Sequence, residues 1–283
     1  MIVYLNGDYL PLEQARVSVL DRGFLFGDGV YEVIPVYARR PFRLQEHLAR
    51  LAASLQAIRL DNPLTAAQWV ERIERICTLA PWPDQGIYLQ VTRGPGPRDH
   101  AFPAEVHPTV FIMPMPLTTP PREWIEHGVC AITAADERWL RCDVKSISLL
   151  ANVLARQRSV DAGCAETILL RDGWLTEGAS SNVFIVLDGV ICAPPKSHLM
   201  LPGITYDVVL ELARESGLPV QLRPIAEAEL KAAAEVWLTS SPKEVLAVTR
   251  LDGQPVGEGR PGPLYRRMYA AYQDFKRRAM HGG

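Results

Sequence analysis

Lysine is scarce in this sequence. Of the 30 basic side chains among its 283 residues only five are lysine, and the other 25 are arginine. The five are Lys145, Lys196, Lys231, Lys243 and Lys276. A reaction that requires a side-chain amine is therefore restricted to these five positions.

The sequence also lacks an excess of basic charge, and it contains no long apolar run. The formal net charge of -2 argues against a general nucleic-acid binder. No apolar run approaches the roughly 20 residues that span a bilayer, and the first ten residues, MIVYLNGDYL, do not resemble a signal peptide. We expect a globular protein that binds neither nucleic acid nor membrane, in agreement with 48% hydrophobic and 22% charged residues.

Cysteine patterns typical of metal sites are absent too. The five cysteines are odd in number, and their spacing fits no zinc site. They are Cys77, Cys130, Cys142, Cys164 and Cys192. We expect free thiols in the reducing environment of the cytoplasm, with all five cysteines as buried small apolar residues, and we expect no metal centre.

Short hairpins and two helices are predicted for the first part of the chain. Asn6-Gly7 lies between apolar and aromatic runs, which is typical of a hairpin turn. Residues 29–37 alternate as in a strand, and one face carries Val30, Glu32, Ile34 and Val36. The other predicted elements are helices over 46–58 and 66–79 and strands over 86–94 and 109–115.

A proline-rich stretch over residues 113–122 is typical of an extended connector. It divides the chain into a smaller α/β N-terminal domain, residues 1–118, and a larger C-terminal domain, residues 119–283. The second domain is predicted to contain strands over 128–137 and 166–193, helices over 149–163, 204–217 and 263–280, and a hairpin over 244–256. The predicted turns are Asp172-Gly173, Asp188-Gly189 and Asp252-Gly253. The predicted fold class is α/β (α+β), with more hairpins than a doubly wound parallel sheet contains.

Lys145 is the lysine whose neighbouring residues indicate a chemical role for its amine. An arbitrary lysine is most often plain surface charge. Val144 and residues 147–150 around Lys145 are largely apolar, so we expect this amine to be held against a core. Desolvation disfavours the charged form of an amine and makes it a usable nucleophile.

Glu177 lies between two predicted strands, in the segment LTEGASSNVF. A glutamate at a turn is usually solvated. The small residues at 178–181, however, allow a planar ligand to approach the backbone closely. A carboxylate beside such a ligand is suited to pair with a cationic ring nitrogen.

The segment LPGIT places Gly203, Ile204 and Thr205 at the start of a predicted helix. The free N–H groups and the positive end of the helix dipole at such a start bind phosphate. Alternatively, Pro202-Gly203 is only a turn and Thr205 an N-cap. Arg50, on the predicted helix over 46–58, is a candidate cation for a phosphate.

Six separated segments together resemble one family. In chain order they are GFLFGDGVYEV, EHLARL, VTRGPGPRDHAFP, RWLRCDVKS, LTEGASSNVF and LPGIT. They resemble the bacterial D-amino acid aminotransferases, which belong to the branched-chain aminotransferase-like class, fold type IV of the pyridoxal-phosphate enzymes. The resemblance runs from about Tyr4 to beyond Ser241 and thus covers most of the chain.

The resemblance implies a role for each candidate. Lys145 is the implied Schiff-base lysine, and Glu177 is the implied partner of the pyridine nitrogen. The implied phosphate site comprises Arg50, the backbone of Ile204 and Thr205, and the hydroxyl of Ser241, where D-transaminases commonly have threonine. The implied trap for the substrate α-carboxylate comprises Tyr31, Arg98 and His100. In the family the last two come from the neighbouring subunit, which implies a homodimer with a shared active site.

The implied reaction is transamination between D-amino acids, of the D-alanine type, and 2-oxo acids. A branched-chain L-amino acid transaminase shares the cofactor residues, but the pair Arg98–His100 argues against it. An (R)-selective amine transaminase would accept an uncharged substituent where the carboxylate lies, and an aminodeoxychorismate lyase would eliminate pyruvate on the same fold. The presence of Lys145 and Glu177 disfavours a cofactor-binding protein without activity.

Overall fold

The computed structural model describes residues 1–281 and divides into two compact units. Unit 1 comprises Met1–Leu117 together with Val144–Leu149, and unit 2 comprises Thr118–Asp143 and the chain from Leu150 onward. The sequence-based prediction placed everything after residue 118 in the second domain. In the structure, the six residues that include Lys145 pack with unit 1, because their contacts are made with a strand and a helix of that unit.

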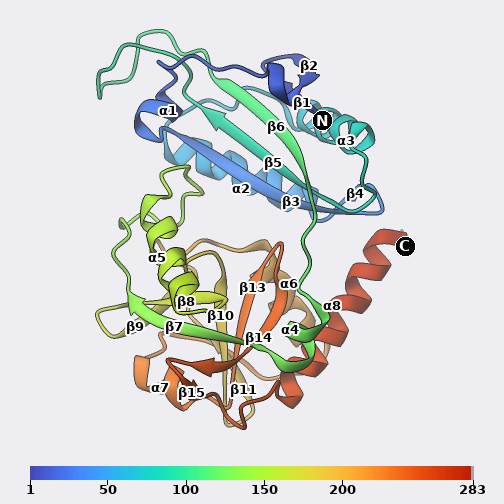
Figure 1. Cartoon of the computed structure of the whole chain (residues 1–283), viewed down its shortest axis with the longest axis vertical. Coiled ribbons are helices and arrows are strands. Elements are labelled where there is room, and N and C mark those ends of the chain that lie inside the picture. Colours follow the sequence, from blue (N-terminus) through green and yellow to red (C-terminus); the bar gives the residue numbers. More distant parts are fainter. Residues whose placement is uncertain (282–283) are drawn as a thin grey trace. The chain divides into compact units, whose positions relative to one another are not determined.

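Unit 1 is built on a six-stranded antiparallel sheet with the order β2-β1-β6-β5-β3-β4 (Figure 1). The strands are β1 (Ile2–Leu5), β2 (Asp8–Pro11), β3 (Gly29–Tyr37), β4 (Arg40–Pro41), β5 (Gln85–Thr92) and β6 (Thr109–Pro116). The hairpin turn predicted at Asn6-Gly7 joins β1 to β2, and both of its residues have positive φ. The strand predicted over residues 29–37 is confirmed as β3, and the face that carries Val30, Glu32, Ile34 and Val36 is the fully buried one.

Two long helices pack on one face of this sheet. They are α2 (Leu44–Ala57) and α3 (Ala66–Leu79), and each agrees with its predicted helix to within about two residues. Thr65 and Gln68 form a capping box that fixes the start of α3. The shared core contains Leu51 and Leu55 from α2, Trp69 and Ile73 from α3, and the apolar side chains of β3, β5 and β6. Two short helices, η1 (Leu12–Gln14) and α1 (Arg22–Phe26), were not predicted.

The proline-rich connector is shorter than predicted, because its first part belongs to β6. Strand β1 pairs with β6 only at Phe111 and Ile112, so Pro114 and Pro116 lie beyond the stretch of β6 that pairs with β1. On that side β6 is an edge, where proline removes no ladder hydrogen bond. Residues 117–121 alone separate β6 from the next helix.

Unit 2 is built on a nine-stranded mixed sheet with the order β12-β11-β10-β13-β14-β7-β8-β9, in which β15 also pairs with β14. The strands are β7 (Val129–Ala135), β8 (Glu166–Arg171), β9 (Trp174–Gly178), β10 (Asn182–Leu187), β11 (Val190–Ala193), β12 (Val220–Leu222), β13 (Glu235–Ser240), β14 (Glu244–Leu251) and β15 (Gln254–Pro255). The three Asp-Gly pairs predicted as turns are confirmed. Both residues of each pair have positive φ, as tight hairpin turns require.

The helices of unit 2 are α4 (Arg122–His127), α5 (Leu150–Asp161), α6 (Ile204–Glu215), α7 (Glu227–Ala232) and α8 (Pro263–His281). Helix α6 packs against α8 and β13, and its N-terminus follows directly on the predicted Pro202-Gly203 turn. Strands β12 and β13 and helices α4 and α7 were not predicted as separate elements.

All five cysteines are free thiols, as expected, and three of them are buried. Within residues 1–281 no group of three or more His, Cys, Asp or Glu side chains is arranged to hold a metal ion. No helix in that range is both long and apolar enough to span a bilayer.

Candidate active site

The backbone of Lys145 is fixed by two elements of unit 1. Its N–H donates to Oγ of Ser54 on α2 at 3.2 Å, and its carbonyl accepts from the N–H of Tyr31 on β3 at 3.0 Å. Ser146, the next residue, forms an isolated bridge with Val30. The Lys145 amine then lies 4.1 Å from the centroid of the Tyr31 ring. Two of the predicted site residues are thus brought together.

Lys145 differs from the other lysines in its partners. Each of the other four forms an ion pair: Lys196 with Asp207, Lys231 with Glu227, Lys243 with Glu166 and Lys276 with Glu244. Within residues 1–281 Lys145 has no carboxylate partner, and its amine lies over the face of an aromatic ring instead. An amine that is not held in an ion pair is available to bind a ligand.

Arg50 lies on α2 in unit 1 and binds a buried carboxylate. Its Nε and Nη2 donate to the two oxygens of Glu32, each at 2.8 Å, and Nδ1 of His47 is 2.8 Å from Oε2 of the same residue. The guanidinium therefore already holds a bidentate pair with Glu32. The triad of Glu32, His47 and Arg50 was not predicted from the sequence. The signal that could have revealed it is Glu32, a charged residue on the same face of β3 as three apolar residues.

The charges of this triad follow from burial and pairing. Burial by itself raises the pKa of Glu32, but the Arg50 guanidinium and the His47 ring lower it to about 2. Burial lowers the pKa of His47, and the charges of Arg50 and Lys145 act in the same direction. A neutral His47 donates from Nδ1 to the Glu32 carboxylate. Its Nε2 is then a buried acceptor that has no hydrogen-bond partner among the described residues.

Arg98 and His100 lie in the long loop between β5 and β6, on unit 1. The side chains of both residues are exposed, as is that of Asp99 between them. The ring of Phe26 lies beneath them, 5.5 Å from the His100 ring centroid and 5.8 Å from the Arg98 guanidinium carbon. Both side chains are thus accessible at the surface of unit 1.

Glu177 is a buried carboxylate at the end of β9 in unit 2. It accepts hydrogen bonds from Arg138 Nη1 at 2.5 Å, from Asn182 Nδ2 at 3.1 Å and from the backbone N–H of Leu201 at 3.1 Å. Glu177 is therefore not solvated, unlike most glutamates at turns. Burial raises the pKa of Glu177 to about 7, and the opposing charge of Arg138 limits this rise.

Arg138 connects Glu177 to a second buried acid. Its Nε and Nη2 each donate to Asp136 at 2.9 Å, and Asp136 also accepts from the Thr176 hydroxyl. Arg171 approaches the same aspartate at 3.2 Å. Arg138 lies in the segment RWLRCDVKS, but nothing in that segment distinguishes it from a surface arginine.

The N-terminus of α6 is held close to Glu177 by Asn182. The side chain of Asn182 donates to Glu177 and to the Leu201 carbonyl, and a Cβ placed on Gly203 would lie 2.0 Å from its Oδ1. Glycine at 203 therefore lets the helix start approach Asn182. Gly203 is the N-cap and no side chain caps the helix, so the alternative that Thr205 is the N-cap is wrong.

Ser241 lies in the turn between β13 and β14 and is partly exposed. Thr239, two residues earlier, pairs with Asn182 in the sheet, and its buried Oγ1 has no hydrogen-bond partner within residues 1–281. Lys243, two residues later, donates to Glu166 at 2.6 Å and to Ser180 at 2.9 Å. These contacts tie the turn to the small-residue segment that follows Glu177.

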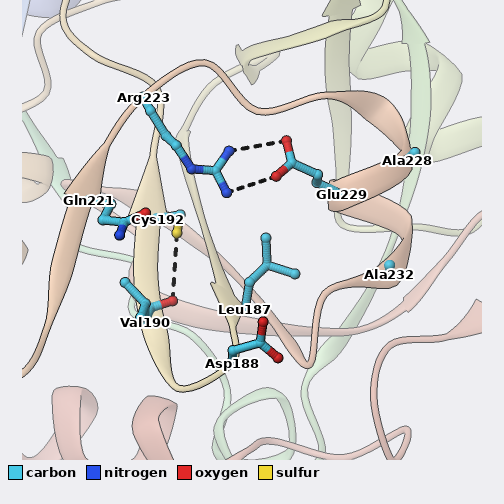
Figure 2. Close-up of a pocket in the computed structure, with 9 residues that line it drawn as sticks. All are labelled: Leu187, Asp188, Val190, Cys192, Gln221, Arg223, Ala228, Glu229 and Ala232. Atoms are coloured by element: carbon cyan, nitrogen blue, oxygen red, sulfur yellow. Dashed lines mark hydrogen bonds and ion pairs between the residues drawn. The ribbon is translucent and has the colours of Figure 1, made fainter.

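The candidate residues thus form two groups, each inside one unit. Unit 1 brings Lys145 next to Tyr31 and holds Arg50 on the buried Glu32. Unit 2 brings Glu177, Asn182 and the start of α6 together. A separate cavity of about 480 Å³ lies in unit 2. Figure 2 shows residues that line it, including the ion pair Arg223–Glu229. No candidate residue lines this cavity, so it has no part in the candidate site.

Comparison with known proteins identifies the family to which this chain belongs. Residues 29–251, more than three quarters of the chain, match the amino-transferase class IV family. This chain belongs to the class IV aminotransferases.

Curated relatives of this aminotransferase align over almost its full length. The D-alanine aminotransferase of Bacillus licheniformis is 43% identical over 274 residues, which cover 97% of this chain and 96% of the relative. The D-alanine aminotransferase of Staphylococcus epidermidis is 39% identical, with 96% and 97% covered.

Solved structures confirm the predicted fold of the aminotransferase. A branched-chain amino acid aminotransferase of T.th., solved with pyridoxamine 5'-phosphate, superimposes with a TM-score of 0.91 at 28% identity, covering 96% of this chain and 93% of the other. The Escherichia coli branched-chain amino acid aminotransferase gives a TM-score of 0.90 at 28% identity over the same fractions. The fold type IV architecture expected from the six segments is therefore correct.

Proposed function

We propose that this enzyme transfers amino groups between D-amino acids of the D-alanine type and 2-oxo acids, with Lys145 as the residue that binds pyridoxal 5'-phosphate. Class IV aminotransferases use this cofactor, and the curated relatives at 43% and 39% identity are D-alanine aminotransferases. The observation that carries the assignment of Lys145 is its lack of a carboxylate partner within residues 1–281, since every other lysine of the chain has one.

The residues present fit the cofactor. An aldehyde needs a nearby amine without a counter-ion, and Lys145 provides it. A pyridinium nitrogen needs a buried carboxylate, and Glu177 provides it. A phosphate needs donors without other partners, and the start of α6 has no capping side chain. The buried and unpartnered Oγ1 of Thr239 beside Asn182 is a further polar atom, among the described residues, for which a ligand would provide a partner.

When bound, pyridoxal 5'-phosphate would supply an aldehyde for amines and an electron-withdrawing ring. Nζ of Lys145 would hold the cofactor through that aldehyde between turnovers. The same Nζ, once free, would take the proton from the substrate Cα and return it to the C4′ carbon. Proton transfer by a positioned side chain contributes about 10²–10⁴-fold to the rate.

Glu177 has the role of holding a proton on the ring nitrogen. A carboxylate beside a protonated ring nitrogen makes a charge-assisted hydrogen bond, which keeps the ring electron-deficient. Arg138 and the Leu201 N–H bind Glu177 from its other sides and fix its orientation. Asp136 in turn fixes Arg138, so that the carboxylate is held by a network rather than by one contact.

For the phosphate we propose the backbone N–H groups of Ile204 and Thr205, the hydroxyl of Ser241 and the guanidinium of Arg50. The first three belong to unit 2, and the positive end of the α6 dipole favours an anion at its start. Arg50 already pairs with Glu32 through Nε and Nη2. We therefore propose that Glu32 orients the guanidinium of Arg50 toward the phosphate.

For the substrate carboxylate we propose Tyr31, Arg98 and His100, the last two from the neighbouring subunit of a homodimer. An arginine binds a carboxylate through two parallel hydrogen bonds. Because one lysine serves one face of the ring, the side of the pocket that anchors the carboxylate determines which configuration is accepted. The exposure of Arg98 and His100 supports an action outside their own chain. We further propose the cytoplasm as the compartment, supported by the five free thiols.

A second candidate is transamination of branched-chain L-amino acids. The solved structures with TM-scores of 0.91 and 0.90 are branched-chain enzymes, which favours this activity at the level of the fold. Identity favours the first proposal, since it is 28% to those structures and 43% to a D-alanine aminotransferase.

The deciding experiment is a substrate panel in single-turnover mode. The purified holoenzyme is mixed with D-amino acids, L-amino acids and (R)-1-phenylethylamine, and the loss of the absorbance of the lysine-bound cofactor is followed. We expect rapid loss with D-alanine and slow or no loss with L-alanine and L-leucine. Preference for L-leucine would replace the proposal with the branched-chain activity.

A further inference from the structure

A buried arginine on the short helix α1 binds the loop that carries Arg98 and His100. Arg22 is 3% exposed, and its guanidinium donates to three consecutive backbone carbonyls of that loop. The acceptors are Asp99 at 2.6 Å, His100 at 3.4 Å and Ala101 at 3.2 Å. One side chain thus fixes the loop on both sides of His100, next to Arg98.

The position of Arg22 is itself fixed by an acid. Its Nε donates to Oδ2 of Asp28 at 2.8 Å, and the same oxygen accepts from Nε of Arg93 at 2.9 Å. The backbone of Arg22 also contributes, since its N–H donates to the Gly94 carbonyl at 2.9 Å. Arg22 is therefore attached to the loop at its start and near its tip.

The neighbours of Arg22 hold the rest of the loop. Oδ2 of Asp21 accepts from the hydroxyls of Thr92 at 3.0 Å and Thr109 at 2.6 Å, the last residue of β5 and the first of β6. The Arg22 guanidinium also lies 4.8 Å from the centroid of the Phe26 ring, the ring beneath Arg98 and His100. Asp21 and Arg22, at the start of α1, thus bind both ends of the loop and residues 99–101 within it.

We propose that Arg22 is a positioning residue that determines the preference for substrates with a carboxylate, because it places Arg98 and His100 where they bind that group. This inference rests on the proposed function of the loop. An exposed loop keeps one conformation only when its backbone carbonyls have hydrogen-bond partners. A shift of about 1 Å in a substrate-binding side chain can lower the rate by about 10²-fold. Lysine does not replace arginine here, because an ammonium lacks the planar set of donors that reaches three acceptors.

The first test compares Arg22→Gln with the wild-type holoenzyme. We expect KM for D-alanine to rise about tenfold or more, which corresponds to about 1.4 kcal/mol of lost binding, with kcat changed by much less. Turnover of (R)-1-phenylethylamine, which has no carboxylate, should remain at the wild-type level. In an Arg98→Ala background the same change should have little further effect on KM, because Arg22 acts through the loop.

A matched control is available in the same unit. Arg39 also donates to three backbone carbonyls, those of Cys77, Thr78 and Ala80, but at the end of α3 and not at the loop. Arg39→Gln should leave KM for D-alanine unchanged. Hydrogen exchange of the loop amides over residues 95–101 should accelerate in Arg22→Gln and not in Arg39→Gln, a readout that is independent of turnover.

Several results would overturn the inference. They are a folded Arg22→Gln protein with wild-type KM for D-alanine, an equal loss with D-alanine and with the amine, or an effect that adds fully to that of Arg98→Ala. If Arg22→Gln does not fold, Arg22→Lys decides, because it keeps the ion pair with Asp28 and loses the fan of donors to the loop. A wild-type enzyme that prefers L-amino acids would refute the proposed function itself, whereas an unchanged KM in an enzyme that uses D-alanine refutes only the role of Arg22.

Discussion

Lys145 and Tyr31 contact each other twice. The backbone N–H of Tyr31 donates to the Lys145 carbonyl at 3.0 Å, and the Lys145 amine lies 4.1 Å from the centroid of the Tyr31 ring. The first contact fixes where the lysine leaves the backbone, and the second places its amine over an aromatic face instead of a carboxylate. The Lys145 amine therefore lies next to Tyr31, one of the residues proposed to bind the substrate carboxylate.

Replacing Lys145 with alanine should abolish transamination. The amine is both the covalent anchor and the proton carrier, so we expect turnover to fall by at least about 10³-fold, since proton transfer alone contributes about 10²–10⁴-fold. The absorbance of lysine-bound cofactor should disappear as well. Lys231→Ala, which removes a surface lysine paired with Glu227, is the control and should behave as wild type. A Lys145→Ala enzyme with near wild-type turnover would refute the assignment.

Glu177→Gln should lower kcat while the cofactor stays bound. The neutral amide would no longer stabilise the protonated ring nitrogen, and the loss of one such electrostatic partner typically costs about 10²–10³-fold. Cofactor content, measured after denaturation, should remain near one per chain. Glu137→Gln, which changes an exposed acid paired with Arg158, is the control. Complete loss of cofactor from Glu177→Gln would instead assign Glu177 a structural role.

Arg98→Ala should raise KM for D-alanine strongly and spare amines without a carboxylate. Removing one partner of a desolvated charge typically costs about 2–5 kcal/mol. The measurement is kcat/KM for D-alanine and for (R)-1-phenylethylamine in wild type and variant. Arg122→Ala, at an exposed ion pair with Glu126, should change neither. Equal losses for the two substrates would show that the loop does not bind the carboxylate.

Glu32 should stabilise the fold in a pH-dependent way. Its pKa is lowered from 4.5 to about 2 in the folded chain. A lowered pKa gives stability that is fully present above pH 4.5 and is lost as the pH falls toward 2. At about 1.36 kcal/mol per pKa unit, this group contributes about 3 kcal/mol.

Urea unfolding of wild type and Glu32→Gln between about pH 3 and 7 tests this contribution. The variant should be less stable at neutral pH, because Arg50 and His47 lose their carboxylate, and the difference should shrink as the pH falls below 4.5. Glu126→Gln, at an exposed pair, is the control and should show no such trend. A difference that is constant with pH would contradict the role of the Glu32 charge.

Gly203→Ala should weaken cofactor binding. A Cβ at this position would lie 2.0 Å from Oδ1 of Asn182, so the start of α6 or Asn182 must move. We expect the Kd of the apo-enzyme for pyridoxal 5'-phosphate to rise about tenfold or more, which corresponds to about 1.4 kcal/mol. Gly86→Ala is a matched control, since its new Cβ would meet only the end of Met115 at 3.5 Å. Equal Kd values for the two variants would argue against a phosphate at this helix start.

Local patterns were sufficient for much of the fold. The alternation of residues 29–37 predicts β3, and the capping box of Thr65 and Gln68 agrees with the predicted start of α3. The Asp-Gly pairs predict three turns correctly. Such features depend on neighbours within a few residues, and the sequence contains them directly. The start of the connector was predicted too early, inside β6. Whether Pro114 and Pro116 lie on an unpaired edge depends on how far the pairing of β1 extends along β6.

What the sequence determined by itself is the family and the set of candidate residues, since six ordered segments and a single suitable lysine are properties of the chain alone. What only the tertiary structure decided is which partners those residues have. Arg50 meets Glu32 from 18 residues away, Arg138 meets Glu177 from 39, and Arg22 meets the Asp99 carbonyl from 77. Hydrogen bonds over such separations leave no periodic trace in a sequence, because they depend on how strands and helices pack and not on local backbone preference.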